Sequence, residues 1–276
     1  MKLLIFGLGY SAGYIADAAR ARGWTVTGTT RDGRGGTLRF DDEVAVRAAL
    51  AEADAVLSSV PPEGKDDPVL ARYGAALGGR LGYLSSTGVY GDAGGAWVDE
   101  SAAITGRRPG RNAADAAWLA RGARVFRLPG IYGPGRSALD RVIEGAAHRI
   151  DLPDQVFSRI HVRDLAAGVL AGFAGPPGAY NLADDLPCAQ NDVIDFACRL
   201  LGRPVLPLQT MDAAGLSPMA RAFYAENRRI ANGKAKRVLG WRPAYADYRL
   251  GLRALSAITN PASASTAPAA ASPDQR

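Results

Sequence analysis

The stretch KLLIFGLGYSA, residues 2–12, is the part of this sequence that decides its fold. It begins with an apolar run of the kind that forms a buried parallel strand, and that run leads directly into a glycine-rich turn. A helical stretch over residues 13–22 and a second strand-like run over residues 24–30 follow. Strand, glycine turn, helix and strand within about thirty residues are the first unit of a dinucleotide-binding sheet.

The turn itself has the pattern Gly7-x-Gly9-x-x-Ala12. Gly7 permits the tight turn, Gly9 lets the backbone approach a pyrophosphate, and Ala12 lets the helix pack on the strand. The helix N-terminus at Tyr10 and Ser11 offers free N–H groups to phosphate. We therefore predict that these five residues bind the cofactor. The alternative is a glycine turn in an unrelated α/β protein.

The end of the second strand bears on the choice of cofactor. A chain that prefers NAD usually has Asp or Glu there to bind the ribose 2′-hydroxyl. This chain has Thr29-Thr30-Arg31, with no carboxylate until Asp32. A guanidinium at Arg31 can bind a 2′-phosphate through two hydrogen bonds. We therefore predict Thr30 and Arg31 as cofactor residues and NADP as the cofactor, and Asp32 keeps NAD open.

Composition indicates an ordinary globular protein. The chain has 276 residues, 47% of them hydrophobic, and no apolar run that reaches the roughly 18 residues needed to cross a bilayer. The first strand begins too early to leave room for a signal peptide, and Cys188 and Cys198 have neither a disulfide framework nor a metal-type spacing. We expect a cytoplasmic protein without a metal site or a membrane partner.

The net charge of +6 does not by itself predict a nucleic-acid partner. The basic residues are scattered, no basic run is interleaved with aromatic residues, and a positive cleft for phosphorylated ligands explains the same excess. We therefore expect no nucleic-acid binding. Only four of the 33 basic residues are lysines, namely Lys2, Lys65, Lys234 and Lys236.

Strand-like and helical segments alternate along the rest of the chain. The alternation predicts an α/β fold with a Rossmann-type, doubly wound parallel sheet whose ligands bind at the carboxyl ends of the strands. Asp164 is expected to cap a helix, and a further helix is expected over residues 220–231. From residue 259 to 276 the composition is typical of a disordered tail. Strands are predicted over residues 54–60, 80–85, 123–128 and 179–182, and helices over 42–52, 69–77, 112–121, 164–173 and 191–201.

Five blocks, in order, resemble the extended short-chain dehydrogenases/reductases (SDR), the superfamily of nucleotide-sugar epimerases and dehydratases. The glycine spacing resembles the atypical, YeeZ-like subgroup of that family. The resemblance implies a Rossmann domain over residues 1–132 with 160–184 and a smaller C-terminal substrate lobe over 133–159 with 185–258. The blocks are residues 84–91, 126–135, 159–166, 180–182 and 239–241.

The resemblance also implies roles for residues at strand ends. In the family, a Ser or Thr after one strand polarises the substrate oxygen, and Ser86 matches that position. Cofactor contacts are implied at the adenosine ribose and at the nicotinamide, for Ser59, Val60, Ser85, Pro129, Gly130 and Ile131.

The family's Tyr-x-x-x-Lys pair is absent from this sequence. Its two positions correspond to Arg111 and Asp115, and no lysine has a tyrosine four residues before it. An arginine cannot exchange protons near neutrality, but it can stabilise a developing oxyanion. Arg111 is therefore a candidate for that role, and Tyr132 is a candidate proton donor facing the nicotinamide. Other candidates for proton transfer are Asp92, Asp99, Glu100 and His161, of which His161 is expected to be structural.

Two functions remain open. The resemblance implies an NAD(P)(H)-binding oxidoreductase or nucleotide-sugar-modifying enzyme with a small-molecule substrate. Arg136, Arg141 and Arg159 could bind that substrate if it is phosphorylated, and a solvated surface position is the favoured alternative for each one. The missing pair favours the alternative, a non-catalytic NADP(H)-binding redox sensor or regulatory protein. Family members often form dimers, which leaves a homodimer open here.

Overall fold

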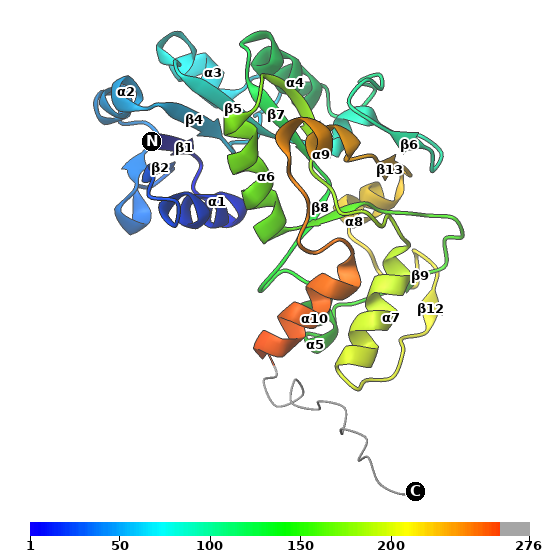
Figure 1. The fold of residues 1–276 in the computed structure, drawn as a ribbon. Helices are drawn as coiled ribbons and strands as arrows, with labels where there is room; N and C mark the ends of the chain where they lie inside the picture. The colour runs from blue at the N-terminus through cyan, green and yellow to red at the C-terminus, as the bar shows by residue number, and fades with distance from the viewer. Residues whose placement is uncertain (260–276) are drawn as a thin grey trace, which may run out of the picture.

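The computed structural model describes residues 1–259 of the chain, and its centre is a seven-stranded parallel sheet. The strand order is β11-β7-β5-β4-β1-β2-β3, so the chain moves outward from β1 in both directions. This is the predicted doubly wound Rossmann-type sheet (Figure 1). The strands are β1 (Lys2–Phe6), β2 (Thr25–Thr30), β3 (Leu38–Arg39), β4 (Ala55–Ser58), β5 (Arg80–Ser86), β7 (Arg124–Leu128) and β11 (Gly178–Asn181).

Helices cover both faces of the sheet because successive side chains of a buried strand point to opposite faces. Leu3 and Ile5 of β1 pack with α1 and α6, whereas Leu4 and Phe6 pack with the helices of the other face. Figure 1 shows α1 and α6 side by side on one face. The first face carries α1 (Tyr10–Arg20) and α6 (Val162–Ala174), and the second carries α2 (Glu43–Glu52), α3 (Pro68–Tyr73) and α4 (Pro109–Ala120).

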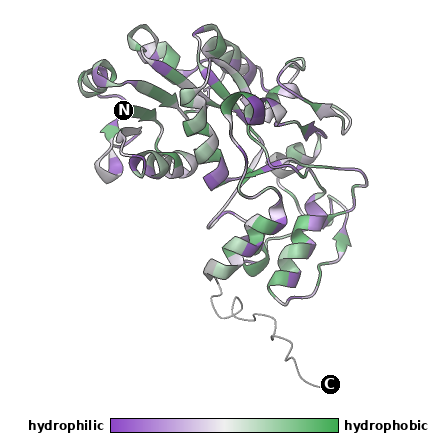
Figure 2. Cartoon of the chain, viewed as in Figure 1, coloured by the Kyte–Doolittle hydropathy of each residue, from purple (hydrophilic) through white to green (hydrophobic). Residues whose placement is uncertain are grey.

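Three more helices form a separate hydrophobic cluster below the sheet in Figure 1. They are α5 (Ala138–Ile143), α7 (Gln190–Leu200) and α10 (Tyr248–Thr259), and the short parallel strands β9 (Arg149–Ile150) and β12 (Leu208–Gln209) lie beside them. Figure 2 shows hydrophobic residues on the facing sides of these helices. A two-stranded parallel pair, β8 (Gly130–Tyr132) and β10 (Arg159–His161), leads from the sheet to this cluster.

One late helix returns to the sheet. Helix α9 (Gly233–Leu239) packs against α6 and β11, and Ala235 and Trp241 belong to the same hydrophobic core as β1. The division into 1–132 with 160–184 and 133–159 with 185–258 stays a prediction. Of the predicted tail 259–276, Thr259 ends α10 and the remainder lies outside the described residues.

The predicted helix over residues 220–231 is confirmed only as far as Tyr224 and is wrong beyond it. Helix α8 covers Pro218–Tyr224, and Arg229–Ile230 form strand β13, which pairs with β6 (Trp97–Val98). Asn227 explains the difference, because distant segments bind its backbone and its side chain. Its N–H donates to Asp92, its carbonyl accepts from Ala93 and Gly95, and its side chain bonds to the backbone of Asp154 and Val156. These contacts hold the segment extended.

Asp164 does not cap the helix that follows β10, which corrects a second expectation. His161 is the cap residue of α6, and its Nδ1 accepts a hydrogen bond from the N–H of Arg163. Asp164 lies one turn later and accepts hydrogen bonds from the N–H groups of Ala244 and Tyr245. The carboxylate therefore anchors the loop before α10 to α6.

Candidate nucleotide-binding and catalytic site

The turn after β1 forms an open cradle at the N-terminus of α1. Gly9 precedes the helix without a side-chain cap, and no acidic residue lies in the first turn. A Cβ atom added to Gly9 would have no heavy atom within 4 Å. The first N–H groups of a helix lack partners within it, so this open turn fits the pyrophosphate of a dinucleotide.

Gly7 is needed for a different reason. Its φ of +81° lies in the left-handed region, and a Cβ there would stand 3.0 Å from both Ser59 Oγ and Val60 Cγ2. Ser59 also donates a hydrogen bond to the Gly7 carbonyl. The structure thus brings Gly7, Ser59 and Val60 together between β1 and β4, where doubly wound sheets bind their ligands.

Arg31 is the unpaired cation at the end of β2. Within residues 1–259 it is exposed and forms no hydrogen bond or ion pair. Asp32, the nearest carboxylate in sequence, lies 3.5 Å from Arg34, and Arg39 pairs with Asp41. Hydrogen bonds from backbone N–H groups hold the pKa of Asp32 below its usual value. A guanidinium without a partner at this edge is suited to bind a phosphate.

Tyr10 joins the glycine turn to the chain that follows β8. Its hydroxyl donates to the carbonyl of Pro134 at 3.0 Å, and the Arg136 guanidinium lies 5.7 Å from the centre of its ring. Burial is the main reason why the pKa of Tyr10 rises to about 12. The tyrosine therefore connects the predicted cofactor site to residues 133–136 as a neutral group.

Ser86 stands at the end of β5 on the same edge of the sheet. Its Oγ accepts a hydrogen bond from the N–H of Gly88 at 3.1 Å, which leaves its own O–H free to donate. Ser86 pairs in register with Leu128, so the predicted nicotinamide segment, Pro129 to Ile131, begins directly beside it.

Asp115, at the position of the family's lysine, is buried in an ion pair. It is 1% exposed, and Arg127 of β7 is 3% exposed. Arg127 Nη2 donates to Asp115 Oδ1 at 2.8 Å and Nε donates to Oδ2 at 3.2 Å. Ser85 Oγ donates to the same Oδ2 at 2.6 Å. The ion pair therefore fixes the side chain of Ser85 at the end of β5.

The same network continues across the sheet. Arg127 Nη1 donates to the Tyr90 hydroxyl at 3.1 Å, and Tyr90 donates to Asn181 Oδ1 at 2.7 Å. Burial raises the pKa of Tyr90. Because both partners of its hydroxyl are protein groups, these surroundings favour a structural role for Tyr90.

Arg111, at the position of the family's tyrosine, turns toward another part of the sheet. Its Nη1 donates at 2.9 Å to the hydroxyl of Tyr83, whose ring stacks on Trp118. No hydrogen bond within residues 1–259 joins Arg111 to Ser86.

A residue that sequence reasoning missed, Arg228, lies nearer to Ser86. A Cβ on Gly88 would stand 3.3 Å from Ser86 Oγ and 4.0 Å from Arg228 Nη2, so both groups face one point. Arg228 Nη1 is held by the Gly91 carbonyl and by Glu226, each at 2.6 Å. No motif marks this arginine, and only the pairing of β13 with β6 brings it here.

Tyr132 is buried in the hydrophobic cluster formed by α5, α7 and α10. Its hydroxyl is buried without a hydrogen-bond partner, 2.1 Å from the point where a Cβ on Gly251 would stand. Its ring meets His161 edge to face at 5.2 Å. Burial raises the pKa of Tyr132 and lowers that of His161 to about 4. These surroundings favour a structural role for both side chains.

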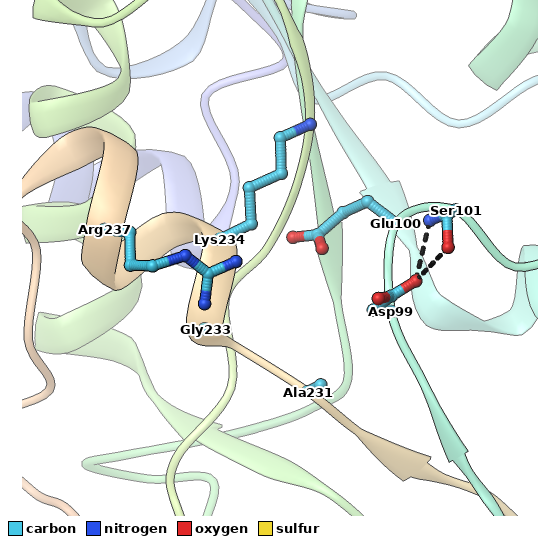
Figure 3. Close-up of a pocket in the computed structure, with 7 residues that line it drawn as sticks. All are labelled: Asp99, Glu100, Ser101, Ala231, Gly233, Lys234 and Arg237. Carbon is cyan, nitrogen blue, oxygen red and sulfur yellow. Dashed lines mark hydrogen bonds between the residues drawn. The ribbon is translucent and has the colours of Figure 1, made fainter.

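The acidic candidates are all engaged. Asp92 accepts from the N–H of Asn227, Asp99 from Ser101, and Glu100 from the N–H of Asn181. Figure 3 shows Glu100 extending toward Lys234 and Arg237 across a cavity of about 340 Å³. This cavity contains two acidic and two basic side chains, and it lies beside α9 rather than beside the glycine turn.

A second cavity, of about 430 Å³, lies between β8 and the helices α5, α7 and α10. Gly130 and Ile131 form part of its wall, so it opens onto the predicted nicotinamide segment. Arg136, Arg141 and Arg159, the possible contacts of a phosphorylated substrate, also line it, and their role in substrate binding stays a prediction. Within residues 1–259 no group of three or more His, Cys, Asp or Glu side chains could hold a metal ion, and no helix could cross a membrane.

Comparison with known proteins gives one curated relative and two solved structures of note, and no family model matches. The chain is 29% identical to protein YeeZ of Escherichia coli K12 over 241 residues, covering 73% of this chain and 84% of YeeZ. A functionally unknown conserved protein from Silicibacter pomeroyi is 41% identical, with a TM-score of 0.81 over 93% of this chain and 98% of that one. The human epimerase family protein SDR39U1, solved with NADPH, is 17% identical with a TM-score of 0.74, covering 93% and 99% of the two chains. That third likeness shows the fold alone.

Proposed function

We propose that this homologue of protein YeeZ, which resembles the atypical extended SDR proteins, is an NADP(H)-dependent oxidoreductase acting on a small molecule. The observation that carries the proposal is the open glycine turn combined with the unpaired Arg31 at the end of β2. SDR39U1, which has the same fold, was solved with NADPH. NAD remains the alternative cofactor.

In this proposal, the residues at the carboxyl ends of β1, β2 and β4 bind different parts of the dinucleotide. The N–H groups of α1 and the backbone at Gly9 bind the pyrophosphate, Arg31 binds the 2′-phosphate, and Ser59 and Val60 flank the adenosine ribose. Thr30 supports the end of β2 through its contact with Thr37, in which the two Oγ1 atoms are 2.7 Å apart. When bound, the nicotinamide ring supplies or accepts a hydride.

The substrate oxygen is bound beside Ser86. The free O–H of Ser86 donates to that oxygen, and the Nη2 of Arg228 places a positive charge on the same side. Ser85 and its buried partners Asp115 and Arg127 keep the end of β5 in place. Because a guanidinium does not exchange protons near neutrality, Arg228 stabilises charge and does not act as an acid.

A redox sensor or regulatory protein is the second candidate function. The residues that replace the family's Tyr-x-x-x-Lys pair favour this function. Asp115 forms an ion pair with Arg127, and Arg111 donates a hydrogen bond to Tyr83. The sensor would bind NADPH as tightly as the enzyme but would not oxidise it. Nicotinamide absorbance, followed with a panel of carbonyl compounds and nucleotide sugars, separates the two.

The first test is a calorimetric titration with NADPH and with NADH. Arg31→Ala should weaken NADPH binding by about 1–3 kcal/mol, the range for a charge-assisted hydrogen bond, and leave NADH binding nearly unchanged. Arg34→Ala is the matched control, because Arg34 already pairs with Asp32 and should affect neither cofactor. Equal losses for both cofactors in Arg31→Ala would rule out the 2′-phosphate role. No binding of either cofactor to the wild type would overturn the proposed function.

A further inference from the structure

The cavity of about 430 Å³ beside Gly130 contains a buried cation without a counter-ion. Arg159 is 6% exposed, and it takes part in none of the ion pairs within residues 1–259. Its guanidinium is held by neutral acceptors: the carbonyl of Phe157 at 3.0 Å, Cys188 Sγ at 3.0 Å and Gln190 Oε1 at 3.2 Å. Burying an unpaired charge is costly, so the site is built to receive an anion.

The buried acidic side chain of Asp184 senses the charge of Arg159, but within residues 1–259 it forms no ion pair with Arg159. The backbone N–H of Asp184 donates to the carbonyl of Arg159. Burial raises the pKa of Asp184 to about 8, although the charge of Arg159 acts to lower that pKa, and the group is therefore protonated near neutrality. The positive charge of Arg159 therefore remains available to a ligand.

Arg159 also lies next to the predicted site of hydride transfer. It pairs in register with Gly130, and a Cβ on Gly130 would stand 4.0 Å from Arg159 Cγ. A ligand that reaches Arg159 therefore lies against the segment that is expected to contact the nicotinamide.

One part of the remaining wall is apolar and aromatic, whereas Arg136, Asp140, Arg141 and Glu144 place charged side chains on another part. Phe157 and Phe223 stack at 4.4 Å with their rings 7° from parallel, and Phe223 is 51% exposed. Ile131, Val193 and Leu252 complete the apolar wall. Such a wall binds a flat apolar body better than a sugar, because sugar hydroxyls need polar partners.

The neutral polar side chains of the wall are already engaged. Ser137 forms a capping box with Asp140, Ser158 accepts from the N–H of Ile230, and Gln190 accepts from Arg159. These three neutral groups therefore offer few hydrogen bonds to a ligand that packs against the aromatic part of the wall. A planar carboxylate, in contrast, matches the planar fork of a guanidinium.

We propose that this cavity binds a small acid with a flat, aromatic body, whose carboxylate pairs with Arg159 and whose ring packs against the Phe157–Phe223 pair. This inference rests on the proposed function for its link to hydride transfer, but the binding step does not require it. With a keto acid bound there, NADPH held at the glycine turn would supply a hydride to the carbonyl carbon and solvent would supply a proton to the oxygen, so the products would be a hydroxy acid and NADP⁺.

Phenylglyoxylate and its neutral amide, phenylglyoxylamide, are the probes, titrated calorimetrically into the full chain saturated with NADP⁺. The acid should bind at least about tenfold more tightly than the amide, the factor expected for one charge-assisted interaction. Arg159→Met should remove that difference. Arg199→Met, a change of an exposed arginine of α7 that does not line the cavity, should alter it less than about threefold.

Phe223→Ala is a second test in case Arg159→Met does not fold. Because the ring of Phe223 is exposed, its removal should leave the hydrophobic core intact. It should weaken both probes by about the same factor. Equal binding of acid and amide by the wild type would overturn the proposal, as would tighter binding of UDP-glucose or inorganic phosphate than of the acid. Selective binding of the acid without NADPH oxidation would support the proposed ligand of the cavity and contradict the proposed oxidoreductase activity.

Discussion

The buried pair of Asp115 and Arg127 yields a prediction whose size follows from the structure. Asp115→Asn preserves volume but removes the charge that receives two hydrogen bonds from Arg127 and one from Ser85. Arg127 would then be buried, at 3% exposure, without a counter-ion. Breaking one partner of such a pair costs about 3–5 kcal/mol, a large part of the roughly 5–15 kcal/mol that stabilises a typical domain.

Urea unfolding followed by circular dichroism measures this loss. With a slope of about 3 kcal/mol per molar, Asp115→Asn should lower the midpoint by about 1 M or more. The double variant Asp115→Asn/Arg127→Met should recover part of the loss, because neither charge then remains buried.

Asp17→Asn is the matched control for a surface pair. Asp17 lies 3.1 Å from Arg20, with side chains 78% and 50% exposed, so its loss should cost less than about 1 kcal/mol. If Asp115→Asn costs no more than this control, or if the double variant is as unstable as the sum of the single ones, the pair does not hold β5 and β7 as argued.

Three further predictions concern single positions. Gly9→Asp should leave the unfolding midpoint nearly unchanged, since a Cβ there meets nothing within 4 Å, and should abolish NADPH binding measured by calorimetry; retained affinity would refute the pyrophosphate site. Asp184 has its pKa raised by burial from 3.8 to about 8, so the folded state holds a proton that the unfolded state has lost, and wild-type stability should fall as the pH rises through that window. Urea midpoints at pH 5, 7 and 9 should show this slope in the wild type and not in Asp184→Asn, and parallel slopes would contradict the assigned cause. Tyr132→Phe removes a buried hydroxyl without a partner, so stability should stay equal or rise by about 1 kcal/mol with turnover unchanged; a folded variant without turnover would instead identify Tyr132 as the proton donor.

The parts of the fold that sequence predicted are those that local chemistry determines. The run over residues 2–6 is apolar on both faces because β1 is covered on both, and the glycine turn after it needs Gly7 at a φ of +81°. The start of α2 could also be predicted, since Asp42 caps that helix by accepting a hydrogen bond from the N–H of Ala45. In each case the residues that decide the structure are neighbours in the chain.

The parts that sequence could not predict depend on distant segments. Residues 220–231 have helical periodicity, but two loops that are distant in sequence, at Asp92 and at Val156, bind Asn227. Arg228 reaches the point beside Ser86 only because β13 pairs with β6. His161 replaced Asp164 as a cap because Asp164 is used by the loop before α10. Propensity is a weak guide where tertiary contacts of this kind compete with it.

The absent Tyr-x-x-x-Lys pair has the same explanation. In the sequence, Asp115 is recognised only as a residue that stands where the family has lysine. In the fold, its carboxylate binds the buried Arg127 of β7 and the hydroxyl of Ser85 of β5. A lysine at this position would bring a second cation against Arg127 with no carboxylate to balance either one. The position is therefore not a vacant remnant of the family's site. Arg127 and Asp115 together fill it with a satisfied ion pair, and any chemistry at Ser86 has to draw on groups, such as Arg228, that come from outside the motif.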